Sequence, residues 1–232
     1  MSSSFSFSQG IRVVYSVQMN TPALPELDDP NIRAVVEAQL KALNKNFVLL
    51  QNNGESLYFP DEASQSNKSN SQVMRIGSNG GNAVIYKNLR NRQTVSQEFI
   101  LDKQFLITEP LEQIQWTLSS EEKKVGDFIA KKATYKDKDH EITAWYSPEI
   151  PVSDGPGKNS GLPGLILELN SASQTIIAQD INLNFDTSGK IAAPSSGKSV
   201  SRKEFDEMRN QRMKELGVDG TQPGGGVRVI RM

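Results

Sequence analysis

The sequence predicts a mainly β protein, built as a strongly curved antiparallel sheet, half-barrel or bowl-like, with one helix in its N-terminal half and one near its C-terminus. Short stretches rich in β-branched and aromatic residues follow one another closely, separated by small polar turns such as "SNGGN" at 78–82. The regular alternation of strands and helices that parallel βαβ units require is missing. Glycines and prolines between the strands supply the bends of a curved sheet.

The composition fits one globular domain with few kinds of reactive group. The 232 residues are 36% hydrophobic, which is enough for a buried core. Lys and Arg number 26 against 27 acidic residues, so no basic surface for nucleic acid is expected. No apolar run of about 18 residues suggests a transmembrane segment. Cysteine is absent and histidine occurs once, so neither a metal nor a cofactor is expected.

The chain divides into three predicted parts. Residues 1–9, within "MSSSFSFSQG", lack the basic start and long apolar stretch of a whole secretory signal but resemble the end of one. They are either a signal-peptide remnant or a short disordered leader. Residues 10–216 form a single β-rich domain. Residues 217–232 form a Gly-rich tail that ends in "VRVIRM", either a last edge strand or disordered.

The first part of the domain combines a strand, a helix and a hairpin. Residues 11–19 predict a strand, and 28–46 predict a helix that Pro30 suits in its first turn. Two further strands, 47–51 and 55–59, flank "NNG", in which Asn53-Gly54 favours the positive φ of a tight turn. The polar residues 61–71 predict a surface loop.

The remaining elements are further short strands and a C-terminal helix. The predicted strands are 72–77, 82–88, 92–101, 104–108, 115–118 and 173–185, with a hairpin over 123–147 whose charged tip is "KDKDHE". The helix, 199–216, has Ser201 as its cap and Glu204 three residues on, which is the capping-box spacing. Gly217 ends it.

Three motifs raise the question of chemistry, and each has a simpler interpretation. "SSGKS" at 195–199 is not a phosphate-binding loop, because Ala192 occupies the position of the required glycine. The acids of "DKDHE" at 137–141 fit a solvated hairpin tip better than a calcium loop. Glu149 and Asp154 are the first candidates for a hydrolytic pair of carboxylates. However, Asp154 in "VSDGP" fits a turn that its own side chain caps, with Gly155 taking the unusual dihedral. No catalytic residue is assigned.

The stretch from 144 to 169, "AWYSPEIPVSDGPGKNSGLPGLILEL", is the most informative. Its prolines and glycines make a stiff, tightly turned crossing between an aromatic strand and an aliphatic one. One interpretation is that it closes an end of the curved sheet and fixes strand register. The other is that it presents backbone and aromatic groups to a ligand or partner. The candidate contact residues are Trp145, Tyr146, Asp154, Pro156, Leu162 and Pro163.

Within this stretch, "GLPGLIL" at 161–167 resembles the signature of the GLPGLI family of Gram-negative bacterial proteins. Residues 47–59, 116–134, 144–156 and 201–212 resemble other parts of the family pattern. The chain departs from that pattern at Ala130, where relatives often carry cysteine, and at Gly157, where they often carry an aromatic residue.

The resemblance implies a location and a class of protein rather than a reaction. Family members usually carry signal peptides, and their genes often neighbour those of TonB-dependent receptors. We therefore expect an exported, non-enzymatic binding or accessory protein of the periplasm or outer membrane, with such a receptor as a candidate partner. The family is also similar to a bowl-shaped domain of some peptide-N-glycosidases, from which no catalytic residue carries over. Two alternatives stay open: a hydrolase of glycans or peptides that uses paired carboxylates, and a periplasmic carrier of lipid or lipoprotein acyl chains.

Overall fold

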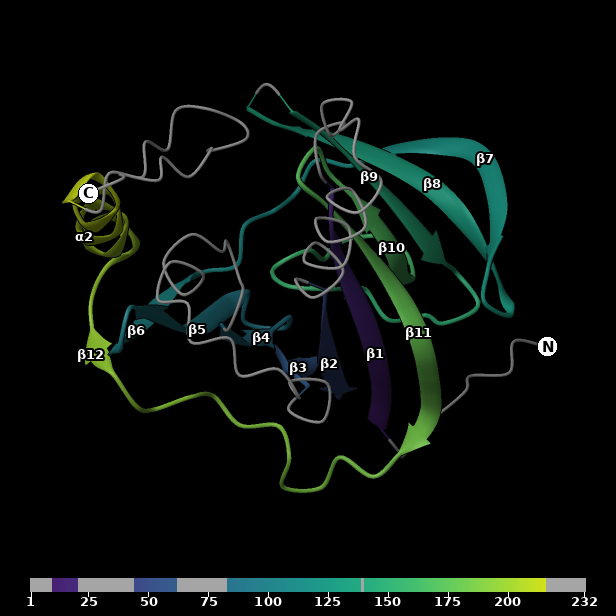
Figure 1. Ribbon diagram of the computed structural model, residues 1–232. Helices are drawn as coiled ribbons and strands as arrows, with labels where there is room; N and C mark the ends of the chain where they lie inside the picture. Colours follow the sequence, from purple (N-terminus) through teal and green to yellow (C-terminus); the bar gives the residue numbers. More distant parts are fainter. Residues whose placement is uncertain (1–9, 21–43, 62–82, 139, 216–232) are drawn as a thin grey trace, which may run out of the picture.

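The computed structural model describes residues 10–20, 44–61, 83–138 and 140–215, which form one large sheet and one helix (Figure 1). The elements are β1 Gly10–Met19, β2 Lys45–Asn52, β3 Glu55–Pro60, β4 Val84–Asn88, β5 Gln93–Ile100, β6 Lys103–Pro110, β7 Thr117–Val125, β8 Phe128–Asp137, β9 His140–Ser147, β10 Leu165–Asn170, β11 Gln174–Phe185, β12 Lys198–Ser199 and α2 Arg202–Glu215. The predicted fold class is confirmed. Five predicted segments lie wholly or largely outside the described residues: 1–9, the helix at 28–46, the loop at 61–71, the strand at 72–77 and the tail.

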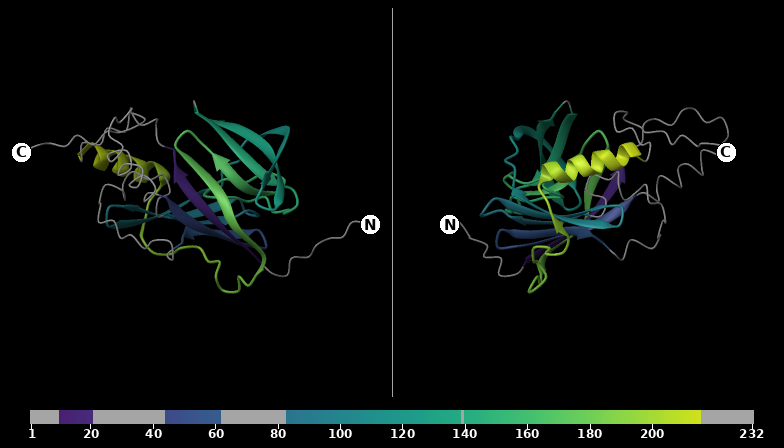
Figure 2. Two further views of the ribbon diagram at one scale, coloured as in Figure 1. Left: turned by 45° about the vertical axis from the view of Figure 1, so that its right-hand side comes forward. Right: turned by 90° about the vertical axis from the view of Figure 1, so that its left-hand side faces the viewer.

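The sheet is an open antiparallel meander in two halves. Its strand order is β12-β6-β5-β4-β3-β2-β1-β11-β10-β9-β8-β7, and every pair is antiparallel except β12 with β6. Strands β1 to β6 form one half and β7 to β11 the other, and the pairing of β1 with β11 joins them. Figures 1 and 2 show the two halves turned toward each other, with β1 and β11 at the bend. Residues 111–116 carry the chain from one half to the far strand of the other.

Local sequence explains the turns that were predicted. Asn53 and Gly54 adopt φ of 48° and 74°, and Asn52 pairs with Glu55, as expected for a two-residue hairpin. The charged tip joins β8 to β9, where Asp137 pairs with His140. The predicted hairpin over 123–147 differs from the structure at its start, because residues 123–125 belong to the preceding strand, β7. A second turn at Gly126, with φ of 59°, joins β7 to β8.

Helix α2 begins with the predicted capping box. The Ser201 backbone N–H donates to Glu204 Oε2 at 2.8 Å, and the Glu204 N–H donates to Ser201 Oγ at 3.2 Å. The helix packs against β6 through Phe205, whose ring meets that of Phe105 edge to face with centroids 5.5 Å apart.

The main core lies on the inner side of the bent sheet. Alternate residues of β1 point into it, with Ile11, Val13 and Tyr15 at most 1% exposed. Ile150 and Leu162, from the connection between β9 and β10, join the same cluster. The inner side is therefore filled partly by a loop. In the described part of the chain, no helix is long and apolar enough to cross a membrane.

Candidate functional site

Residues 148–164 form a long connection between β9 and β10, which we call the inner loop. Adjacent antiparallel strands can be joined by a tight turn, so the sheet itself does not require this length. The loop is bonded internally: Val152 N–H donates to the carbonyl of Ile150 at 2.7 Å, and Asp154 N–H donates to that of Val152 at 2.8 Å. Further along, Asn159 N–H donates to the Pro156 carbonyl at 3.2 Å. The inner loop is therefore an ordered structure of its own.

A β-bulge joins the inner loop to the sheet. The register of β10 against β9 shifts between Ile166 and Glu168. The Ile166 N–H donates to the Asp154 carbonyl at 2.9 Å, and the Ile166 carbonyl accepts the Tyr15 hydroxyl at 2.7 Å. The bulge thus directs the backbone of Ile166 toward the loop on one side and β1 on the other.

Two glycines allow the close packing of this loop. A Cβ on Gly164 would lie 2.2 Å from the Ser147 carbonyl oxygen, and one on Gly155 would lie 2.7 Å from Ile166 Cβ. The expectation that Gly155 takes an unusual dihedral is wrong, because positive φ falls on Gly157 and Gly161, at 63° and 97°. Gly155 is needed for space rather than for backbone conformation.

The inner loop is attached to strands on both halves of the sheet. Lys158 forms an ion pair with Glu109 on β6. The Trp116 indole N–H donates to the Ser160 carbonyl at 2.9 Å, and the Trp116 ring packs edge to face on Tyr135 of β8 with centroids 4.7 Å apart. The inner loop therefore contacts both halves of the sheet and helps to hold them together.

The centre of these contacts is a buried ion pair between Lys87 and Asp154, and both side chains are 0% exposed. Lys87 comes from β4, contacts Asp154 Oδ1, and also donates to the Gly155 carbonyl at 2.7 Å. The Gly155 N–H donates to the same Oδ1 at 2.7 Å, so Asp154 does cap its own turn as predicted. Within the described part of the chain, Asp154 Oδ2 has no hydrogen-bond partner. Buried ions are stable only when they are paired and hydrogen-bonded, and this pair meets that requirement on Oδ1 alone.

Polar neighbours surround the pair. Ser56 and Thr94 flank Lys87 in the cross-strand register, and their side chains are 0% and 1% exposed. Tyr15 also lies nearby. Its burial raises the pKa of the phenol well above the usual value, and the negative charge of Asp154 raises that pKa further. Tyr15 therefore stays a neutral donor to the Ile166 carbonyl.

The six predicted contact residues occupy different surroundings. Tyr146, Asp154, Pro156 and Leu162 are buried, Trp145 is partly exposed and Pro163 is exposed. Trp145 and Tyr146 are adjacent on β9, so they point to opposite faces of the sheet. The ammonium of Lys123 lies 4.4 Å from the Trp145 ring centroid and pairs with Glu168 at 2.7 Å. An external partner would thus meet Trp145 and Pro163 before the other four.

The candidate acids are not brought into one catalytic arrangement. Glu149 is exposed and accepts the Ile129 N–H at 2.9 Å, whereas Asp154 is buried against Lys87. Asp154 is the one carboxylate that is buried among the described residues. Those residues also contain no group of three or more potential metal ligands, although Asp139 of the charged tip falls outside them. "SSGKS" contributes Lys198 and Ser199 to β12.

Sequence reasoning missed Lys87 and Tyr15. Lys87 belongs to a short strand, and its partner lies much later in the chain, so no local motif marks the pair. One signal was available, because Ala83, Ile85 and Lys87 alternate on a single face and the first two are buried in the core. A lysine that continues an inward-facing apolar row needs a buried acceptor.

A family model and several solved structures match the chain. Residues 135–168 match the family described as "Protein of unknown function (Porph_ging)". This stretch runs from β8 through the inner loop into β10 and includes residues 161–167. No curated protein matches the chain.

Among the solved structures that match are two of PNGF-II, in space groups P21 and C2. They superpose with TM-scores of 0.58 and 0.57 at 14% identity, and the match covers 88% of this chain. The chain spans 34% and 33% of those two chains, about a third of their length. At this identity the likeness shows the fold alone.

Proposed function

We propose that this protein is an exported, non-enzymatic binding or accessory protein of the GLPGLI type, located in the periplasm or at the outer membrane. It binds a protein partner through the hairpin of β7 and β8, and a TonB-dependent receptor is the partner class that we favour. The inner loop holds the sheet in shape and does not act on a substrate.

The exposed edge at β7 is the observation that carries this proposal. β7 is the last strand of the sheet and pairs only with β8 among the described strands. Most of its residues are exposed, and two of the three large exposed apolar side chains in the described chain lie on this hairpin: Leu118 at 56% and Ile129 at 46%. In the register, Leu118 faces Ala133 and Ile129 faces Lys124. Unpaired strand edges and exposed apolar side chains are both features that partners use.

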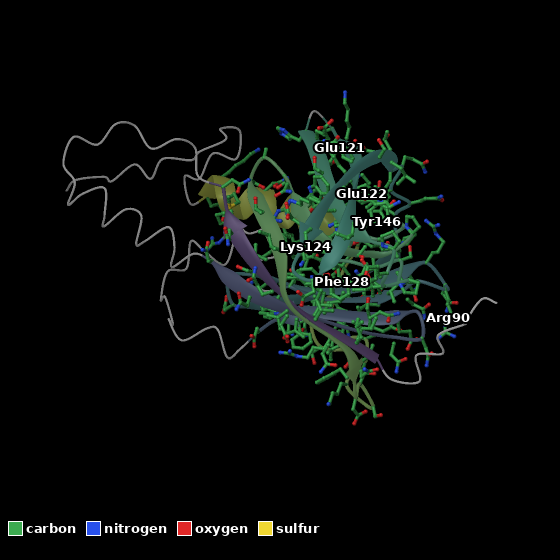
Figure 3. The ribbon with its side chains drawn as sticks, turned by 90° about the vertical axis from the view of Figure 1, so that its right-hand side faces the viewer. Arg90, Glu121, Glu122, Lys124, Phe128 and Tyr146 are labelled. Atoms are coloured by element: carbon green, nitrogen blue, oxygen red, sulfur yellow. The ribbon has the colours of Figure 1, made fainter. Side chains whose placement is uncertain are left out.

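The charges of the hairpin are largely paired within the sheet. Glu121 pairs with Lys132 at 2.8 Å, and Glu122 pairs with Lys131 at 3.4 Å. Figure 3 shows Glu121, Glu122 and Lys124 along β7. Because charged side chains along an edge discourage indiscriminate strand pairing, a partner needs a complementary pattern to add to β7. This favours a specific protein partner over self-association.

Three further considerations support export and an accessory, non-enzymatic role. The resemblance of 161–167 to the GLPGLI signature lies inside the stretch that matches the uncharacterised family. The fold also makes up about a third of each PNGF-II chain, so it occurs there beside further parts of a longer protein. Asp154, the buried carboxylate, is neutralised by Lys87, and this favours a structural role for it.

Site-specific photocrosslinking in the native host tests the proposal. A photoreactive phenylalanine replaces Leu118 or Ile129 in the full-length protein, and the same replacement at Lys198 on β12 is the matched control, because Lys198 is exposed at the opposite edge. We expect Leu118 and Ile129 to crosslink to one outer-membrane protein and Lys198 not to do so. Fractionation of the same cells reports whether the protein is exported.

Either of two results would overturn the proposal. One is recovery of the protein in the cytosolic fraction with its N-terminal residues intact. The other is equal crosslinking from all three positions, because a specific interface at β7 predicts a contrast between the two edges. A supporting second variant, Leu118→Glu with Ile129→Glu, should abolish crosslinking from a probe at Lys124 while leaving unfolding unchanged.

A further inference from the structure

We propose that Lys87 and Asp154 form an intramolecular isopeptide bond, a covalent amide between Lys87 Nζ and Asp154 Cγ that fastens the inner loop to β4. The proposal is independent of the partner proposed above. It concerns the same two side chains that form the buried ion pair.

The geometry already places the two reacting side chains in contact. Lys87 Nζ is in direct contact with Asp154 Oδ1, and both side chains are 0% exposed. The Gly155 carbonyl accepts a hydrogen bond from Nζ at 2.7 Å, which fixes the amine beside the carboxyl group. Holding two reactants in such an arrangement replaces a bimolecular encounter with a unimolecular step.

The two carboxylate oxygens have different surroundings, and the difference fits the reaction. Oδ1 accepts the Gly155 N–H at 2.7 Å, so a donor is in place for the negative charge that develops there during attack. Oδ2 is buried without a hydrogen-bond partner among the described residues. None of the described residues holds Oδ2 in place, and we assign it as the leaving atom.

The step is balanced without any added reagent. One proton moves from the Lys87 ammonium to the Asp154 carboxylate, which then carries it on Oδ2, and the nitrogen lone pair attacks Cγ. The tetrahedral intermediate carries its charge on Oδ1. A second proton passes from nitrogen to Oδ2, the Cγ–Oδ2 bond breaks, and one water molecule leaves. An ammonium and a carboxylate thus become one neutral amide.

Burial favours the amide over the ion pair. Two charges removed from water carry a desolvation cost that the neutral product does not. The chain contains a comparison pair, Lys158 with Glu109, which is also in direct contact but has side-chain exposures of 39% and 21%. Those charges keep part of their hydration, so we expect no covalent bond there.

Intact mass and peptide mapping of the purified full-length protein test the proposal. We expect the wild-type mass to fall below the sequence mass by one water molecule, and trypsin to leave the peptides of Lys87 and Asp154 joined. The Lys87→Arg variant should regain the full mass. Asp154→Asn should lose ammonia instead of water, because its side-chain nitrogen then leaves. Glu109→Gln, the matched control, should keep the loss of water.

One other dehydration must be distinguished, because Asp154 precedes Gly155 and such pairs can cyclise to a succinimide with the same mass change. A succinimide would persist in Lys87→Arg, would be cleaved by hydroxylamine and would leave the two peptides separate. A succinimide result, a wild-type protein of full mass, or a loss of water mapped to another lysine would each overturn the proposal.

Discussion

The two ends of the sheet protect their backbone in different ways. At the β6 end, β12 pairs in parallel with β6 and the Val200 N–H donates to the Leu106 carbonyl at 3.1 Å. Helix α2 then covers the inward residues of that strand. At the β7 end, none of the described strands or helices pairs with the outer edge of the strand. Its charged side chains and its bulge between Leu118 and Glu122 make casual pairing unfavourable.

The side chains at each end explain why the β6 end is covered by a helix and the β7 end is not. Phe105 and Ile107 on β6 are apolar and would be exposed without a cover, and Phe205 of α2 completes their cluster. Arg202 fastens the helix, donating to Glu98 at 2.6 Å and to Glu109 at 3.0 Å. On β7 the corresponding stretch carries charged residues that stay hydrated. An apolar edge must be packed against other residues, whereas a charged edge can stay hydrated and remain available to a binding partner.

The largest expected effect comes from removing the cover at the β6 end. Phe205→Ala should lower the free energy of unfolding by about 3 kcal/mol, because a large buried aromatic ring is lost and a cavity remains. Leu118→Ala is the matched truncation at the β7 end and should change it by less than about 0.5 kcal/mol, since that side chain is largely exposed. Urea unfolding of both variants measures the contrast. Equal losses at the two ends would show that the edges are not protected differently.

Acidification should weaken the covered end more than the open one. Burial alone would raise the pKa of Glu109, but hydrogen bonds from Arg202 and Lys158 outweigh it and the pKa is lowered. A lowered folded-state pKa contributes stability that is complete above the ordinary glutamate pKa of about 4.3 and is lost as pH falls through the folded value. We therefore expect unfolding free energy to decline over that acidic range, as measured by urea unfolding at a series of pH values.

Glu109→Gln and Glu121→Gln separate the two ends in this experiment. Glu121 on β7 also has a lowered pKa, chiefly through its hydrogen bond from Lys132, but its side chain is largely exposed and solvent screens the interaction. Glu109→Gln should flatten the acid decline clearly, and Glu121→Gln should leave it almost unchanged. The opposite order would contradict the assignment of the ion cluster to the α2 end.

Removing charge at the β7 edge should have the smallest effect on stability. It should nevertheless increase the self-association of the protein measurably. Replacing Glu122 and Lys124 together by valine should change the unfolding free energy by no more than about 0.5 kcal/mol, because both side chains are exposed. It should promote self-association, since an apolar edge can pair with another copy. Sedimentation velocity over a concentration series measures this. Valine replacement of Lys198 and Ser199, on the two-residue β12, should have a weaker effect.

Local sequence patterns predicted much of the fold. The Asn53-Gly54 turn, the Ser201–Glu204 cap and the closely spaced strands each depend on residues within a few positions of one another, and the structure confirms them. The candidate site could be predicted only in part from the sequence. Asp154 was singled out for its turn, and its contact with Lys87 was not foreseen, because strand β4 and the inner loop are far apart in sequence.

The amino-acid sequence by itself determined the class of fold, the Asn53-Gly54 turn and the helix cap, because backbone dihedrals and hydrophobic alternation are local properties. Tertiary structure alone decided which edge α2 covers, which edge stays open, and that a lysine of β4 meets an aspartate of the inner loop. Those outcomes depend on how the sheet bends, and the bend brings together groups whose separation along the chain leaves no local pattern to read.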